Sequence, residues 1–377
     1  MKKESDKIVL IDGSRIIIEA LAQTGAQVYA GYPITPANWL YSYAHSRFPT
    51  FLAAPDEITA LQWAAGFSAT GKLPVTGTSF PGLALMMETL NMAFMMELPV
   101  VIVLAQRMGP STGSATTGAQ GDLLLLRGAI SGGYTIPVFC PSDLTDCWEL
   151  ASQSAAAAIK LRTPVILLTS KEMIMTKQSF DLSQLQSITP AQWCYDKGKE
   201  NYQPYQSAPG EAPPFLAAGN DHRQVRLNAS THDASGLIKK ATPEALANTR
   251  RLQEKIERRI SEFTFYEYQN DEGADTLIVT YGISAGAARK AVQFRKSKGN
   301  KVSLLVLKTL LPVPPSIFDI LSQYDHLVFV EENLSGLLTE ILFGKQGHKN
   351  IRSVNQIGRM ITPSEIEGEV ASCSRVS

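Results

Sequence analysis

The chain has 377 residues, 44% of them hydrophobic, and its 35 basic side chains balance 35 acidic ones. A chain of this length and hydrophobic content is expected to form two globular cores, and its composition is not that of a disordered protein. A net charge of zero argues against bulk binding to nucleic acid or to an anionic membrane surface.

The sequence predicts neither a signal peptide nor a membrane span. Residues 1–7 are highly charged, and only about five apolar positions follow before Gly13, too few for a signal-peptide core. The longest apolar stretch, 83–96, is interrupted by Glu88 and Asn91 and is shorter than the ~20 residues that a span requires. We therefore expect a cytoplasmic protein.

The cysteines are few and dispersed, with no C-x-x-C pair and no histidine spaced to complete a zinc site; they are Cys140, Cys147, Cys194 and Cys373. We expect no metal and no iron–sulfur cluster on this chain. Cys140 and Cys147 are interpreted as buried apolar residues in a reducing compartment.

Residues 8 to about 170 alternate between predicted helices and predicted strands. The helices are expected at 13–24, from 36 onward, and at 56–70, 81–95 and 143–160. The strands are expected at 27–30, 50–53, 75–78, 100–104, 136–139 and 165–168. This alternation, with nearly continuous apolar strands, predicts a doubly wound parallel α/β sheet covered on both faces, in a first domain of residues 1–176.

Residues 177–270 are predicted to be an irregular linker or wrapping arm that ends in a helix. The stretch 177–245 is polar, rich in proline and glycine, and has little periodicity. Residues 243–262 are highly charged but carry one apolar face, which indicates an amphipathic helix; the apolar positions are Leu246, Leu252, Ile256 and Ile260.

A second alternating block occupies residues 271–377. Its strands are expected at 276–280, 302–307 and 327–331, and its helices at 285–298, 315–322 and 334–343. The loop 282–286 has the glycines of a phosphate loop but lacks a third glycine at dinucleotide-fingerprint spacing, and no acid ends the next strand. The alternative is a tight strand-to-helix turn with Ser284 as the helix cap.

Three segments that carry chemical groups lie where predicted strands meet predicted helices: 31–36, 56–61 and 106–113. In an open parallel α/β sheet, ligands bind in the crevice beyond the carboxyl ends of the strands. A hydroxyl, a carboxylate and a guanidinium are therefore expected to converge in one site.

Each of these groups also has a structural explanation. Glu57 starts a largely apolar helix, where it is either a proton-exchanging carboxylate or a favourable charge at the helix dipole, and Asp56 beside it is the better cap. Thr35 is a candidate helix cap, with Pro36 at the first helical position.

Arg107, next to the hydroxyls of Ser111 and Thr112, suits capture of a carboxylate or phosphate, the alternative being an exposed salt bridge. The segment Thr78-Ser79-Phe80 closes another strand with free amides that favour an anion.

Taken together, the sequence resembles the α subunits of 2-oxoacid:ferredoxin oxidoreductases, thiamine-diphosphate enzymes that convert 2-oxoacids to acyl-CoA and CO2 by oxidative decarboxylation. The resemblance covers nearly the whole chain, and the 2-oxoglutarate enzymes (2-oxoglutarate synthases) are the nearest branch, followed by those acting on branched-chain 2-oxoacids. The matching segments are 32–36, 56–60, 78–86, 97–100, 106–113 and 120–123.

The resemblance implies a fold and a set of roles. The first domain would be the pyrimidine-binding domain for thiamine diphosphate, and the second a transketolase C-terminal-like domain with a structural and assembly role. Glu57 would be catalytic, contacting the aminopyrimidine ring. The remaining expected roles are substrate binding by Thr35, Arg107, Ser111 and Thr112, and cofactor binding by Tyr32, Pro33, Thr78, Ser79 and Phe80.

The family's diphosphate-and-magnesium motif, Gly-Asp-Gly followed by Asn, does not occur in this chain. The resemblance therefore implies a β subunit that supplies the diphosphate site, Mg²⁺ and an iron–sulfur cluster. Ferredoxin, coenzyme A and possible γ or δ subunits are the further partners.

Two positions depart from the family pattern. Phe80 stands where family members commonly have glycine, and a His-Gly-Glu stretch is missing near residues 131–134. Both departures leave the particular 2-oxoacid open. A pyruvate or branched-chain enzyme, a non-redox thiamine-dependent decarboxylase and a catalytically silent scaffold subunit remain as alternatives.

Overall fold

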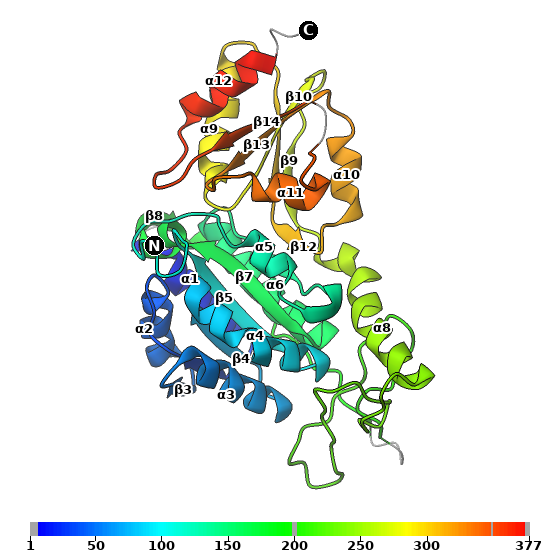
Figure 1. Ribbon diagram of the computed structural model, residues 1–377. Coiled ribbons are helices and arrows are strands. Elements are labelled where there is room, and N and C mark those ends of the chain that lie inside the picture. Colours follow the sequence, from blue (N-terminus) through cyan, green and yellow to red (C-terminus); the bar gives the residue numbers. More distant parts are fainter. Residues whose placement is uncertain (1–6, 198–201, 348–349, 374–377) are drawn as a thin grey trace.

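The computed structural model describes residues 7–197, 202–347 and 350–373, which form two α/β domains stacked one above the other (Figure 1). The first domain contains a seven-stranded sheet in the order β12-β6-β7-β5-β4-β2-β3, in which β12 alone is antiparallel to its neighbour. Its strands are β2 (Val28–Gly31), β3 (Thr50–Ala53), β4 (Pro74–Thr78), β5 (Val100–Gln106), β6 (Val138–Phe139), β7 (Pro164–Ser170) and β12 (Thr309–Leu311). The six strands predicted for this block are all present.

Helices cover both faces of this sheet, which explains why β4, β5 and β7 are buried along their whole length. One layer consists of α1 (Gly13–Gln23), α2 (Asn38–Arg47), α6 (Leu144–Leu161) and α7 (Lys171–Met175). The other consists of α3 (Glu57–Ala69) and α4 (Phe80–Met95), while the short α5 (Leu123–Arg127) packs against the second domain. The predicted doubly wound α/β architecture is confirmed.

The start of α2 differs from the prediction. The helix begins at Asn38, its cap is Ala37, and no side chain caps it, so Thr35 is not the helix cap and Pro36 is not its first residue. The reason is local: a residue that precedes proline is disfavoured in the helical region, and Thr35 precedes Pro36. A further two-stranded antiparallel sheet of β1 (Ile8–Ile11) and β8 (Gln178–Asp181) was not predicted.

The second domain has a five-stranded sheet in the order β14-β13-β10-β11-β9, with β9 antiparallel and the others parallel. Its strands are β9 (Tyr266–Gln269), β10 (Thr276–Tyr281), β11 (Ser303–Leu307), β13 (His326–Glu331) and β14 (Ile351–Asn355). Its helices are α9 (Ser284–Ser297), α10 (Pro315–Leu321), α11 (Leu337–Phe343) and α12 (Pro363–Cys373). β9, β14 and α12 were not predicted.

Helix α11 starts three residues later than expected. The side-chain oxygen of Asn333 accepts hydrogen bonds from the backbone amides of Ser335, Gly336 and Leu337, and Gly336 has a φ of 72°. Residues 333–336 therefore form a turn before the helix, and the glycine supplies the left-handed conformation that the turn requires.

The two domains share one hydrophobic core. Strand β12, which follows β11 of the second sheet, pairs with β6 at the edge of the first sheet. Side chains of the second sheet, including Tyr281 and Phe329, belong to the same buried cluster as Ile102 at the centre of the first. A separate cluster fills the space between the second sheet and the layer of α9 and α12.

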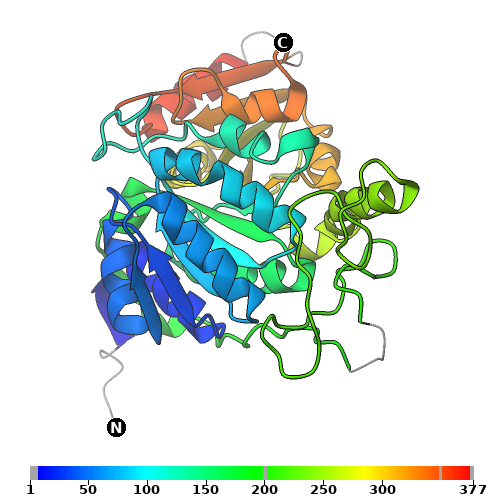
Figure 2. The same ribbon diagram turned by 60° about the horizontal axis from the view of Figure 1, so that its bottom comes forward.

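Residues 182–197 and 202–242 form the expected irregular arm, which runs beside α8 (Pro243–Glu257) (Figure 2). Arg162 fixes the arm by donating from Nη1 to the carbonyl oxygens of Pro204, Pro213 and Pro214. The expected apolar face of α8 is only partly correct, because Leu246 is 38% exposed. The helix ends at Glu257, and a short 3-10 turn follows.

Within the described residues, no helix is long and apolar enough to cross a membrane.

Candidate active site

The predicted site segments follow strands β2, β3, β4 and β5, which are adjacent in the first sheet in the order β5-β4-β2-β3 and run in the same direction. Their carboxyl ends therefore lie along one edge of the sheet (Figure 1). Of the candidate residues, Glu57, Thr78, Ser79 and Arg107 are buried there, whereas Tyr32, Pro33, Ser111 and Thr112 are exposed around the rim.

Glu57 is the first residue of α3 and is 7% exposed. The cap of this helix is Asp56, whose Oδ1 accepts a hydrogen bond of 2.7 Å from the backbone amide of Thr59. The prediction that Asp56 rather than Glu57 caps this helix is confirmed.

Glu57 and Thr78 pack together around Gly82 in the first turn of α4. A Cβ atom at Gly82 would lie 2.6 Å from Cγ and 2.9 Å from Oε1 of Glu57, and would also collide with the hydroxyl of Thr78. Only glycine allows the carboxylate to sit against this turn. Among the described residues, no side chain or amide donates a hydrogen bond to the Glu57 carboxylate.

Arg107 extends from the end of β5 to the segment after β2. Its Nη1 donates a 2.6 Å hydrogen bond to the carbonyl oxygen of Thr35, while its Nε is buried without a partner. Burial lowers the pKa of the Arg107 guanidinium, and the nearby charges of Asp122 and Glu57 oppose that shift. Arg107 is 6% exposed, so the alternative of an exposed salt bridge is wrong.

A cavity of about 380 Å³ opens beside Arg107, between the two domains. Its walls come from both; the lining residues are Phe80, Arg107, Gly109, Pro110, Ser111, Ala119, Gly121, Asp122, Asn333, Leu334, Ser335, Leu337 and Ile357. The structure thus brings Phe80, Arg107 and Ser111 to one space, and Thr112 is not among its lining residues.

Part of the wall of this cavity was not predicted. The second domain was expected to be structural, yet Asn333, Leu334 and Ile357 line the wall. Asp122 was also missed as a site residue, although it lies in one of the segments that carry the family resemblance. Its burial, which only the structure reveals, distinguishes it from an ordinary loop acid.

The glycine-containing loop at 282–286 does not form a phosphate site. A Cβ at Gly282 would lie 3.0 Å from Nε2 of Gln120 and 3.1 Å from Sγ of Cys140, so the first domain covers this turn. Ser284 does not cap α9; its hydroxyl donates to Oε1 of Gln120 at 2.8 Å. The loop is a packed turn at the domain junction.

The segment without the family's histidine lies away from the cavity. The backbone amide of Ser131 donates to Oδ1 of Asn91, eleven positions after Phe80 in the same helix. At 1.5 Å per residue, these positions are about 16 Å apart along α4. Phe80 does line the cavity, so of the two departures from the family it is the one that faces this space.

Several buried polar atoms around the strand ends have no hydrogen-bond partner among the described residues, an arrangement that is uncommon in protein interiors. They are Ser79 Oγ, Gln106 Nε2, Arg107 Nε and Asp122 Oδ2.

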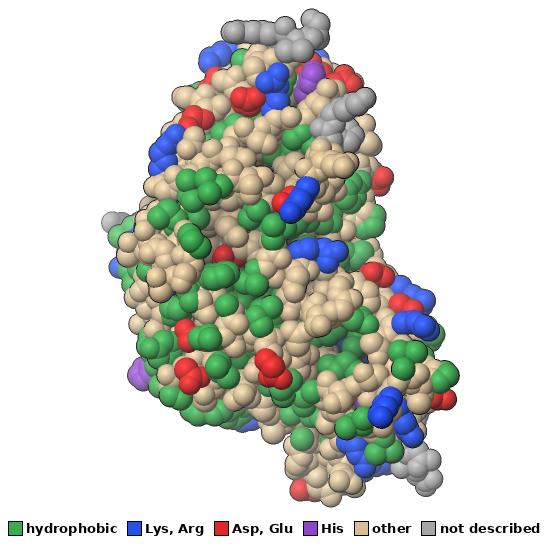
Figure 3. Space-filling model, viewed as in Figure 1, with side chains coloured by type: hydrophobic (Ala, Val, Ile, Leu, Met, Phe, Trp, Pro, Cys, Tyr) green, Lys and Arg blue, Asp and Glu red, His purple; other side chains and the backbone are tan. Residues whose placement is uncertain are grey.

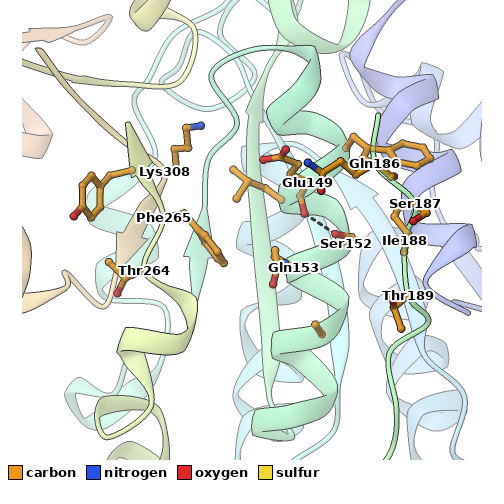
Figure 4. Close-up of a pocket in the computed structure, with 14 residues that line it drawn as sticks. Glu149, Ser152, Gln153, Gln186, Ser187, Ile188, Thr189, Thr264, Phe265 and Lys308 are labelled. Atoms are coloured by element: carbon orange, nitrogen blue, oxygen red, sulfur yellow. Dashed lines mark hydrogen bonds between the residues drawn. The ribbon is translucent and has the colours of Figure 1, made fainter. Parts of the chain in front are cut away.

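A larger cavity of about 750 Å³ lies elsewhere, along α6 and the extended segment 186–189 (Figure 4). None of the predicted site residues lines it. Lys308, which lines this cavity, forms an ion pair with Oδ1 of Asp146 at 2.5 Å. The hydroxyl of Ser152 donates a hydrogen bond to the carbonyl oxygen of Glu149. Of the two cavities, only the smaller one between the domains is lined by predicted site residues.

Comparison with known proteins finds relatives over nearly the whole chain. The chain is 31% identical over 352 residues to the 2-oxoglutarate oxidoreductase subunit KorA of Mycobacterium tuberculosis, covering 89% of this chain and 53% of that protein. It is 27% identical over 372 residues to the 2-oxoglutarate synthase subunit KorA of Methanothermobacter thermautotrophicus, and this match covers 97% of this chain and 98% of that protein. The chain thus spans about half the mycobacterial relative and nearly all of the archaeal one.

Among solved structures, the 2-oxoglutarate:ferredoxin oxidoreductase of Magnetococcus marinus, determined with 2-oxoglutarate, coenzyme A and succinyl-CoA bound, superposes with a TM-score of 0.90 at 26% identity. The match covers 98% of this chain and 66% of that chain.

The fold is that of a thiamine-diphosphate-binding α/β protein. The family model described as pyruvate flavodoxin/ferredoxin oxidoreductase, thiamine diphosphate-binding, matches residues 19–248, and the chain belongs to that family. Core domain II of pyruvate:ferredoxin oxidoreductase matches residues 274–366.

Proposed function

We propose that this chain is the α subunit of a thiamine-diphosphate-dependent 2-oxoacid:ferredoxin oxidoreductase. The reaction is the oxidative decarboxylation of a 2-oxoacid, with 2-oxoglutarate as the favoured substrate, to acyl-CoA and CO2, and ferredoxin accepts the electrons. The names of the full-length archaeal relative and of the Magnetococcus structure support this substrate.

The observation that carries the proposal is the contact between Glu57, Thr78 and Gly82. It puts a buried carboxylate without a donor at the carboxyl edge of a parallel sheet, in a chain whose family binds thiamine diphosphate.

The residues present fit the aminopyrimidine half of this cofactor. A buried carboxylate and the unpartnered hydroxyl of Ser79 are polar groups that a nitrogen-bearing ring satisfies. Thiamine diphosphate, when bound, supplies the nucleophilic carbon that adds to the oxo group of the substrate. Tyr32, Pro33, Thr78 and Phe80 complete the proposed cofactor surface.

The residues of this chain would then have separate roles toward the cofactor and the substrate. Glu57 holds a proton at a carboxylate oxygen facing a ring nitrogen of the cofactor. Arg107 presents its free Nε to the substrate carboxylate, while its Nη1 stays fixed on Thr35. Thr35 faces the oxo group, and Ser111 and Thr112 form the outer part of the substrate site.

A partner subunit is needed to complete the site. The described residues contain no group of three or more His, Cys, Asp or Glu side chains arranged to hold a metal ion. We assign Mg²⁺, the diphosphate site and an iron–sulfur cluster to a β subunit, and we place the complex, with its possible γ or δ subunits, in the cytoplasm.

The face formed by α3 and α4 fits such a partner. Apolar side chains gather over it (Figure 3), and Ile58, Trp63 and Leu85 are 40%, 39% and 53% exposed. Exposed apolar patches of this kind mark protein interfaces. The face begins at Glu57 and Phe80, the first residues of its two helices, so a partner docked there would also close the site.

The test uses the chain co-purified with its β subunit. Reduction of a viologen dye is measured with 2-oxoglutarate, coenzyme A, thiamine diphosphate and Mg²⁺, and each component is omitted in turn. We expect dye reduction that requires the 2-oxoacid and the cofactor. An intact complex that turns over no 2-oxoacid would refute the proposal.

A branched-chain 2-oxoacid is the second candidate substrate. The cavity beside Arg107 has apolar walls from Phe80, Leu334, Leu337 and Ile357, and Arg107 is the only cation among its described lining residues. A higher kcat/KM for 2-oxoisovalerate than for 2-oxoglutarate in the same assay would select this candidate.

A further inference from the structure

Asp122 is a buried acid whose side chain does not cap its helix and whose near polar neighbours are the Gln106 amide and the Arg107 guanidinium. It is 5% exposed, and its Oδ2 has no hydrogen-bond partner. It occupies the cap position of α5, but its side chain makes no capping hydrogen bond. The usual explanation for an aspartate at a helix start therefore does not apply to this residue.

Asp122 and Arg107 line the same cavity without forming an ion pair in the part of the chain that the structure describes. The two side chains are near enough for the charge of each to influence the pKa of the other. Arg107 Nε and Asp122 Oδ2 are both unpartnered. A cationic and an acidic side chain thus line one cavity, and each has a buried polar atom without a hydrogen-bond partner.

The position of Asp122 is fixed by the second domain through Gln120. The Gln120 backbone amide donates to the carbonyl oxygen of Glu332 at 2.7 Å, and its Nε2 donates to that of Tyr281 at 2.9 Å. Its Oε1 accepts from Ser284 Oγ at 2.8 Å and from the Glu332 amide at 2.7 Å. Because Gln120 lies two residues before Asp122, these four hydrogen bonds hold the backbone near Asp122 against the second domain.

The surroundings of Asp122 favour its neutral form. Burial raises its pKa to about 7, although the Gln106 amide and the Arg107 guanidinium act in the opposite direction. The other titratable group that faces it is Tyr281, whose own pKa is held well above its usual value, first by burial. Near neutral pH a large share of Asp122 is therefore a carboxylic acid, which can donate a hydrogen bond.

We infer that Asp122 is a further substrate-binding residue, which as a neutral acid donates a hydrogen bond to the 2-oxoacid carboxylate held by Arg107. This inference rests on the proposed function and deepens it. The ionised form of Asp122 would repel the same carboxylate across the cavity. Substrate binding is therefore coupled to the protonation of one side chain.

The affinity for the 2-oxoacid should fall as the pH rises. Below about pH 7 the acid is already protonated, and the affinity for the 2-oxoacid does not change with pH. Well above pH 7, the protonated fraction falls about tenfold for each pH unit, so kcat/KM for the 2-oxoacid falls by the same factor. At these pH values, binding takes up a proton.

The experiment compares the complex containing the wild-type chain with Asp122→Asn and Glu332→Gln variants. Asparagine keeps a donor at the site but does not titrate. Glu332 is the matched control, because burial also raises its pKa to about 7 but it does not line the cavity. kcat/KM for 2-oxoglutarate is measured from pH 6 to 9 at saturating coenzyme A.

We expect the wild-type complex and Glu332→Gln to lose kcat/KM above pH 7, and Asp122→Asn to stay within about threefold across the range. If Asp122→Asn kept the pH profile of the wild-type complex, the inference about Asp122 would be overturned and the proposed function would stand. A wild-type complex without turnover would overturn the proposed function, and the inference with it.

A second measurement needs no variant. Calorimetric titration of the wild-type complex with 2-oxoglutarate at pH 8, in two buffers of different ionisation enthalpy, reports the protons taken up. Uptake approaching one proton for each 2-oxoacid bound supports the inference, and zero uptake contradicts it.

Discussion

Arg107 donates a 2.6 Å hydrogen bond from Nη1 to the carbonyl oxygen of Thr35, and so joins two segments that lie 72 residues apart in the sequence. The bond sets the distance between the segment after β2 and the end of β5, and it leaves Nε of the guanidinium unpartnered. Thr35 and Arg107 are thereby held next to each other at the carboxyl edge of the sheet.

Replacing Arg107 by lysine should raise KM for the 2-oxoacid. Lysine has one ammonium group and cannot bond Thr35 and a substrate carboxylate in the same fork geometry. Loss of a charged hydrogen bond costs about 1.5–3 kcal/mol, or roughly a tenfold to hundredfold rise in KM. Arg47→Lys, on an exposed ion pair with Glu19, is the control and should behave like wild type. Equal KM values in both variants would contradict the assignment.

Gly82→Ala should inactivate the complex without unfolding the chain. The added methyl group occupies the space of the Glu57 carboxylate and the Thr78 hydroxyl, so one or both must move. Because small displacements of reacting groups are costly, we expect kcat to fall by about 10²-fold. Gly368→Ala in α12 is the matched control, since its Cβ would meet nothing within 4 Å. Wild-type activity in Gly82→Ala would show that Glu57 is not held as described.

Phe80→Gly should change which 2-oxoacids are accepted. Phe80 lines the cavity beside Arg107, and its removal enlarges the space available to the substrate side chain. A change of pocket size alters selectivity by about 10- to 200-fold, so the ratio of kcat/KM values for large and small 2-oxoacids should rise by at least the lower figure. Phe294→Ala, on an exposed face of α9, should leave this ratio unchanged.

Glu97→Gln should strongly destabilise the fold. Glu97 is fully buried and pairs with Arg251 and with Lys255, the latter at 2.6 Å. Removing one partner of a buried ion cluster costs about 3–5 kcal/mol, because the remaining charges stay buried. Chemical denaturation should show this loss, whereas Glu254→Gln, on an exposed pair with Arg258, should change the unfolding free energy by less than about 1 kcal/mol.

The same ion cluster should make the free energy of unfolding depend on pH in the acidic range. Burial alone would raise the pKa of Glu97, but Lys255 and Arg251 outweigh it and lower the pKa to about 2 from 4.5. The stabilisation is therefore complete above pH 4.5 and is lost as the pH falls toward 2. In unfolding experiments across this range, Glu97→Gln should lack this part of the acid sensitivity. An identical acid profile in the two proteins would mean that Glu97 carries no such linkage.

The sequence predicts the central strands and the strand-end site well because both follow from local rules. A continuous apolar run such as 100–104 indicates a strand buried on both faces, and polar groups after parallel strands meet at one edge. Glu57, Thr78 and Arg107 are found there for that reason. Asp56 was correctly preferred as the cap because its short side chain reaches the amide of Thr59.

What the sequence missed depends on distant pairings. Residues 309–311 are too short to be recognised as a strand, and they form β12 only because β6 offers an edge in the other domain. On α8, Arg251 and Lys255 are buried, against the amphipathic pattern, because both form ion pairs with Glu97. This partner lies 158 positions from Lys255 in the sequence, so the pairing could not be predicted. The cavity wall at Asn333 and Leu334 is likewise visible only once the domains are packed.

The central claim is that Glu57 serves the cofactor of a 2-oxoacid oxidoreductase. The most direct test is thiamine-dependent viologen reduction by the complex carrying Glu57→Gln, with Glu19→Gln on the exposed face of α1 as the control. The account predicts a loss of about 10²- to 10⁴-fold in kcat for Glu57→Gln, with the complex still assembled in gel filtration and with normal activity in Glu19→Gln. A Glu57→Gln complex that turns over 2-oxoacid within threefold of the wild-type rate would contradict it.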